Sequence, residues 1–251
     1  MPYMGGGIVS DQRRQARGIL SSGSTGEYLD QLAAWFSMDQ ASGDEIDSHT
    51  SGVTLDDETT NPGSGAGVVG NCRIFTAAGS DRLVCVDNAT MSLSTDTAFT
   101  WCGFAKMATV STQQLLAKWD TVSGASIEYE IRYVDGSGLR LFVGNNTTSA
   151  NVIEPTIWSA DTWYFVCAQH DPVANTLGVS INDGAFTTAA WSGGTFDGTA
   201  SFKISGNIGG AGYWNGSLDN WSFHKKVLTA AQITWLYNAG AGRSYAEAAA
   251  A

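Results

Sequence analysis

Basic residues are scarce in this chain of 251 residues. Thirteen Lys and Arg stand against 24 Asp and Glu, which gives a net charge of −11. A protein that binds nucleic acid needs a basic stripe to displace counterions from the phosphate backbone. We therefore expect no nucleic-acid partner. An acidic surface can instead hold calcium, which prefers carboxylate and carbonyl oxygens.

Long apolar runs are missing as well. A helix that spans a bilayer needs about 20 consecutive apolar residues, and no stretch of the sequence provides them. The first seven residues, MPYMGGG, lack the basic start and the apolar run of a secretory signal. The sequence therefore predicts neither membrane insertion nor export by such a signal.

Motifs that carry catalysis are also absent. The chain has no Gly-x-Ser-x-Gly elbow, no Walker loop and no dinucleotide fingerprint. A retaining glycosidase needs two carboxylates about 5 Å apart. Glu128 and Glu130 alternate along one predicted strand, but no third acid follows them at the spacing of Glu-x-Asp-x-x-Glu. We interpret both as part of a solvated strand face and predict that the protein is not an enzyme.

The four cysteines show no Cys-x-x-Cys or Cys/His spacing of a metal site. Cys102 and Cys167 lie in apolar runs, where a buried thiol behaves as a small hydrophobic group. Cys72 and Cys85 could close a hairpin. Disulfides persist in oxidising compartments, and because no export signal is present, we expect reduced thiols.

Glycine is abundant, with 30 residues against 4 prolines, and it separates short apolar runs. Strands are predicted by runs such as LAAWFSMD (32–39), AFTWCGFAKM (98–107), IEYEIRYV (127–134) and WYFVCAQHD (163–171). A hairpin turn is predicted at residues 135–138, Asp-Gly-Ser-Gly. About ten short strands separated by turns predict an all-β fold with two antiparallel sheets.

One short helix is predicted near the C-terminus. Thr229 fits the N-cap, and Gln232 completes a capping box three residues later. Ile233, Leu236 and Tyr237 then form an apolar face at helical spacing. Gly240 fits the position that follows a helix end.

Composition divides the chain into three segments. Residues 1–28 contain a Gly-Gly-Gly run and a basic cluster, and we interpret them as an extended N-terminal arm that attaches to a partner. The cluster consists of Arg13, Arg14 and Arg17. Residues 29–245 form the predicted sandwich domain, and residues 246–251 are a low-complexity tail that we expect to fray.

The order of several segments resembles the laminin G-like jelly rolls of the concanavalin A-like lectin/glucanase superfamily. The matching segments include FTWCGFAKM, LLAKWD, DTWYFVCAQHD, LGVSINDG and the closing stretch from YWNGSLDNWSF to LYNAG. The resemblance implies a two-sheet antiparallel jelly roll over about residues 32–243. It also implies ligand sites at rim loops or on a concave face, often for glycans, and frequently a calcium ion.

Aromatic rings in loops are the candidates for stacking on sugar, because sugar rings present apolar C–H faces. The ligand-binding candidates are Trp119, Asp120, Trp158, Trp191, Tyr213 and Trp214. Asp39 and Asp219 end or open strands that are often neighbours in a sandwich, so they are the candidate calcium ligands. Asp120 and Asp171 are alternatives, and a structural role in a turn remains open for Asp219.

Two classes of function follow from these features. The first is a non-catalytic structural or adhesion protein of a virus particle such as a phage, which attaches to a capsid or tail protein through its arm and carries a lectin-like domain outward. The second is a carbohydrate-binding lectin outside the cell or at its surface, either free or as a module of a larger bacterial enzyme or surface protein. A cell-surface glycan is the expected ligand in both, and association of several copies remains open.

Overall fold

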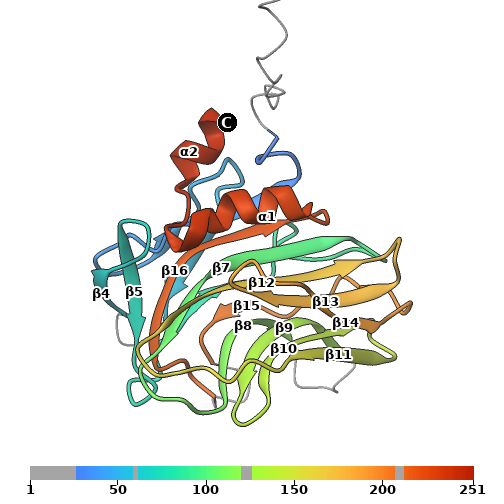
Figure 1. Ribbon diagram of the computed structural model, residues 1–251, viewed down its shortest axis with the longest axis horizontal. Helices are drawn as coiled ribbons and strands as arrows, with labels where there is room; N and C mark the ends of the chain where they lie inside the picture. Colours follow the sequence, from blue (N-terminus) through green and yellow to red (C-terminus); the bar gives the residue numbers. More distant parts are fainter. Residues whose placement is uncertain (1–26, 59–61, 120–125, 207–211) are drawn as a thin grey trace, which may run out of the picture.

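The computed structural model describes residues 27–58, 62–119, 126–206 and 212–251. Their strands form two antiparallel sheets that face each other (Figure 1). The first sheet has the order β14 (Thr187–Ala190), β13 (Thr176–Ile181), β12 (Trp163–Asp171), β7 (Phe99–Met107), β16 (Gly216–His224), β5 (Asn71–Phe75) and β4 (Gly63–Ala66), and β1 (Leu32–Phe36) also pairs with β16.

The second sheet covers the inner face of the first. Its order is β11 (Ser149–Glu154), β10 (Gly138–Gly144), β9 (Ile127–Val134), β8 (Gln113–Trp119), β15 (Phe202–Ile204), β6 (Leu83–Cys85), β3 (Thr54–Asp57) and β2 (Glu45–Ile46). Strands far apart in sequence lie side by side in both sheets, as β1 and β16 do. The predicted jelly-roll sandwich is therefore confirmed.

Alternating side chains from both sheets fill the space between them. Tyr129 and Tyr133 of β9 point into this core. Trp101 of β7 stacks between Phe202 of β15, with ring centroids 5.4 Å apart, and Phe223 of β16, at 4.4 Å. These rings join the two sheets, because Phe202 belongs to the second and Trp101 and Phe223 to the first.

Helix α1 (Ala230–Tyr237) lies across the outer face of the first sheet (Figure 1). The predicted capping box is confirmed, because Thr229 and Gln232 bond each other's backbone N–H. The helix end differs from the prediction. Asn238 takes the left-handed conformation, with φ of 47°, and a 3-10 turn (Asn238–Gly240) follows.

The tail is a second helix rather than a frayed end. Helix α2 (Tyr245–Ala250) begins after Ser244, which forms another capping box with Glu247. Ala248 is buried in the cluster that α1 shares with the first sheet.

Among the described residues, no helix is long and apolar enough to span a membrane.

Candidate functional site

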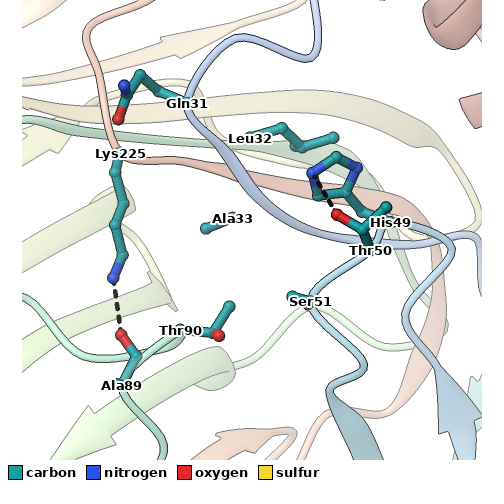
Figure 2. Close-up of a pocket in the computed structure, with 9 residues that line it drawn as sticks. All are labelled: Gln31, Leu32, Ala33, His49, Thr50, Ser51, Ala89, Thr90 and Lys225. Carbon is teal, nitrogen blue, oxygen red and sulfur yellow. Dashed lines mark hydrogen bonds between the residues drawn. The ribbon is translucent and has the colours of Figure 1, made fainter.

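An open groove lies at the rim of the sandwich, where the first and last strands meet, and we call it the rim groove. Its volume is about 370 Å³. Four separate segments of the chain contribute to it (Figure 2). The lining residues are Gln31, Leu32, Ala33, His49, Thr50, Ser51, Ala89, Thr90 and Lys225.

A buried carboxylate holds one wall of the rim groove in place. Asp47 accepts hydrogen bonds from the backbone N–H of Trp35, at 2.7 Å, and of His49, at 2.9 Å. The Ser51 hydroxyl donates to its other oxygen. Asp47 therefore fixes the loop from 48 to 51 against β1, and the loop's polar side chains line the groove.

The two sides of the rim groove carry different polar groups. Figure 2 shows Lys225 beside Ala89 on one side and His49 beside Thr50 on the other. Lys225 Nζ donates to the Ala89 carbonyl at 2.8 Å, and partial burial lowers the pKa of Lys225. His49 Nδ1 lies 3.2 Å from the Tyr245 hydroxyl of α2. The groove thus combines hydroxyls, an imidazole and an ammonium group above an apolar floor of Leu32 and Ala33.

Trp191, one of the predicted rings, borders a second groove at the edge of the sandwich. This groove has a volume of about 340 Å³, and Thr148 and Asn175 also line it. The ring itself is only 8% exposed, because Gly193 packs against it and its Nε1 donates to the Gly194 carbonyl at 2.9 Å. Little of this ring is available to a ligand.

Two other predicted rings are parts of the hydrophobic core. Trp158 is 3% exposed and stacks on Tyr164, with ring centroids 4.5 Å apart. Trp214 is fully buried and meets Trp158 edge to face. The expectation that these two rings stack on a ligand is corrected by their burial, which leaves almost none of either ring exposed.

The remaining predicted ligand-binding residues are dispersed. Trp119 is half-buried at the end of β8, and Tyr213 is half-buried with its hydroxyl 3.5 Å from Arg82 Nη1. Asp120 lies outside the described residues, as do three predicted arm residues, Arg13, Arg14 and Arg17. The structure thus does not gather the predicted rings into one site.

Asp39 and Asp219, the predicted calcium ligands, meet at one loop. Asp219 accepts from the backbone N–H of Val68, at 2.6 Å, and of Val69, at 2.9 Å, and Asp39 accepts from that of Asn71, also at 2.6 Å. Burial raises the pKa of Asp219 to about 7, and the charge of Asp39 adds to this shift.

Glu45 completes this acidic cluster. Burial raises the pKa of Glu45 to about 7, and Arg73 opposes the shift. One oxygen on each buried acid, Oε2 of Glu45 and Oδ1 of Asp219, has no hydrogen-bond partner. Such oxygens fit calcium chemically. However, no three acidic, His or Cys side chains of the described residues are placed to share one metal ion.

Glu128 and Glu130 do not form the solvated face that we expected. Glu128 is 1% exposed, and its Oε1 lies 2.5 Å from Lys118 Nζ. Glu130 is fully buried and pairs with Arg140 at 2.7 Å and with Arg132 at 3.6 Å. The expectation was wrong because strand alternation does not reveal which charges find a buried partner.

Residues 78–234 match the model of the Laminin_G_3 family, described as the concanavalin A-like lectin/glucanases superfamily. A search of curated protein sequences gives no match.

Solved structures share the fold at low sequence identity. Domain 4 of AbnA, an extracellular GH43 arabinanase from Geobacillus stearothermophilus solved with arabinotriose, is 16% identical with a TM-score of 0.63. The match covers 85% of this chain and 98% of that one. The binding domain of Paraclostridial Mosquitocidal Protein 1 is 12% identical with a TM-score of 0.70, over 85% and 53% of the two chains. The chain thus spans about half the length of this toxin domain.

Proposed function

The chain belongs to the concanavalin A-like lectin/glucanase superfamily, and we propose that it is a non-catalytic, lectin-like protein that binds a glycan in the rim groove. The observation that carries the proposal is the mixture of groups in that groove. Hydroxyls of Thr50, Ser51 and Thr90 surround an apolar floor. A sugar presents hydroxyls at its edge and C–H groups on its faces, which such a lining complements.

Lys225 gives the rim groove a preference among glycans. Its ammonium group contributes a positive charge to a chain whose net charge is −11. A sugar that carries a carboxylate gains a charge-assisted hydrogen bond there, which is stronger than a neutral one. We therefore expect acidic glycans to bind more tightly than neutral ones of the same size.

Binding of the full chain to a glycan array tests this proposal, followed by calorimetric titration with the strongest ligand. Replacing Lys225 with Ala should raise the Kd by about 10- to 100-fold, as expected for a lost charged hydrogen bond. The matched control is Lys226→Ala, because Lys226 pairs with Asp30 and does not line the groove. An array without signal, or equal Kd values for the two variants, contradicts the proposal.

The absence of catalysis is part of the proposal. The two acids of β9 that could serve a glycosidase are engaged in ion pairs, Glu128 with Lys118 and Glu130 with Arg140. Neither lines the rim groove, whose lining contains no carboxylate. Turnover of a glycan substrate that is lost in Glu128→Gln or Glu130→Gln would overturn this part.

We further propose that the protein is a virion component, a phage decoration or adhesion protein held on a capsid or tail by residues 1–28. Support comes from the sequence, where Arg13, Arg14 and Arg17 form a basic cluster in an acidic chain. Such a cluster can meet an acidic partner surface. Deleting residues 1–28 should abolish co-sedimentation with particles, and undiminished incorporation would contradict the proposal.

A second candidate is a carbohydrate-binding module that works outside the cell or at its surface. It is favoured by the match to nearly all of domain 4 of an extracellular arabinanase. Strong glycan binding without any association with particles would favour this alternative over the virion role. Calcium belongs to both candidates as a proposal, with Asp39 and Asp219 as the side chains that would hold it.

A further inference from the structure

Cys102 of β7 and Cys167 of β12 lie directly opposite each other in the first sheet. Their sulfur atoms are 3.0 Å apart. Opposed residues of antiparallel strands have Cα atoms about 4.5–5.5 Å apart. This range falls within the separations that disulfides bridge, about 4.4–6.8 Å. A disulfide therefore needs only a small approach of the two sulfurs and no shift of the strands.

The other two cysteines have no such geometry. Cys72 belongs to β5 of the first sheet, and Cys85 belongs to β6 of the second. Their thiols donate to backbone carbonyls instead, Cys72 to Ala66 and Cys85 to Val86. The hairpin pairing considered from the sequence is therefore not what the fold brings together.

We propose that Cys102 and Cys167 are a disulfide-forming pair that links the two central strands β7 and β12. The oxidant is a low-molecular-weight disulfide such as glutathione disulfide. The thiolate of one cysteine attacks the oxidant, which releases one glutathione thiol and leaves a mixed disulfide. The second cysteine then displaces the other glutathione. Two protein thiols and one glutathione disulfide thus become one protein disulfide and two glutathione thiols.

Helix α1 controls access to this pair. Ile233 and Leu236 of the helix belong to the same buried cluster as both cysteines, together with Phe104 and Phe165. Cys102 is 1% exposed and Cys167 is fully buried. Burial also raises the pKa of the Cys167 thiol, so little reactive thiolate exists while the helix is docked. Oxidation of the folded protein therefore requires α1 to lift from the sheet.

Peptide mapping of the full chain tests the pairing. The protein is refolded in a mixture of oxidised and reduced glutathione, denatured in iodoacetamide, and digested without reduction. We expect one linked peptide pair that contains Cys102 and Cys167, and alkylated Cys72 and Cys85. Four alkylated cysteines, or a linked pair of Cys72 and Cys85, would overturn the proposal. Because the mapping uses the unmodified sequence, it does not depend on the folding of a variant.

A pair of variants tests the control by α1. Thr229→Ala removes the N-cap side chain, a change that costs about 1 kcal/mol and should speed oxidation of the folded protein about fivefold. Thr229→Ser keeps the capping hydroxyl and is the matched control, with an oxidation rate close to that of the unmodified chain. Equal rates in Thr229→Ala and Thr229→Ser would show that α1 does not shield the pair.

Discussion

Lys118 of β8 and Glu128 of β9 form an ion pair in which neither side chain is more than 1% exposed, with Nζ 2.5 Å from Oε1. Both side chains also form hydrogen bonds with the backbone. Lys118 also donates to the Gly198 carbonyl at 2.8 Å, and Glu128 accepts from the backbone N–H of Leu93 at 3.0 Å. The pair therefore connects β8 and β9 to two loops, and it holds a charge of each sign at the end of the second sheet.

Breaking this pair should destabilise the fold strongly. In Lys118→Met, Glu128 loses its buried counter-charge, and a loss of about 3–5 kcal/mol in the free energy of unfolding is expected. Replacing both residues, as in Lys118→Met with Glu128→Leu, leaves no buried charge unpaired, because Asp87, the other partner of Lys118, is 40% exposed, and should restore part of the loss. Urea unfolding measures both. A single variant as stable as the unmodified protein would contradict the prediction.

The pH dependence of stability should reveal the acidic cluster. Burial raises the pKa of Glu45 and of Asp219 to about 7, above the unfolded values of about 4. Stabilisation from their protonated forms is therefore complete near pH 4 and is lost as the pH rises through 7. We expect the melting temperature to be higher at pH 5.5 than at pH 8, with a loss on the order of a few kcal/mol.

His224 works against this trend. Full burial lowers its pKa to about 3, so its stabilising effect is lost as the pH falls below the unfolded value of about 6.5. Burial also raises the pKa of Glu128 to about 7, and the three acids together outweigh one histidine in this interval. Asp219→Asn keeps an oxygen that can accept from Val68 and Val69, and it should flatten the pH profile. The same pH dependence in this variant and in the unmodified chain would count against Asp219 as a source.

Calcium should stabilise the fold at high pH if Asp39 and Asp219 hold it. A ligand that binds only the folded state at 100 times its Kd adds about 2.7 kcal/mol of stability. The melting temperature at pH 8 should therefore rise in calcium relative to a chelator, and Asp219→Asn should remove the rise. Magnesium, which keeps its waters more tightly, serves as the control ion. An unchanged melting temperature in calcium would contradict the calcium proposal.

Much of the fold could be predicted because the strands obey simple local rules. The turn at residues 135–138 joins β9 to β10, as its glycines indicate. The capping box of Thr229, predicted from the sequence, is present in the structure. The sequence did not predict strands β2, β3, β4, β5 and β11. Glu45–Ile46 of β2 is very short, and Gly63–Ala66 of β4 contains no large apolar side chain. Their strand structure depends on pairing with neighbours, which no local pattern records.

The candidate site could not be predicted in the same way. The rim groove joins Gln31, His49, Thr90 and Lys225, which come together only when β1 pairs with β16. No spacing in the sequence connects these four segments. The aromatic residues chosen from loops were a poor guide, since a ring such as Trp214 can end a Gly-rich loop and still enter the core. Burial of such a ring depends on the opposite sheet.

Gly103 of β7 packs directly beneath the indole ring of Trp221, and this contact gives the sharpest test of the core. A Cβ atom on residue 103 would overlap the ring, which is 1% exposed and donates to the Phe104 carbonyl at 3.1 Å. Because the ring cannot move without losing that bond, Gly103→Ala should cost about 1–3 kcal/mol, the range for an overpacked core. The control is Gly63→Ala in β4, where the new methyl group would lie 3.7 Å from Ile74 Cβ, an ordinary contact. Thermal unfolding should separate the two variants, and equal melting temperatures would show that the sheet adjusts around residue 103.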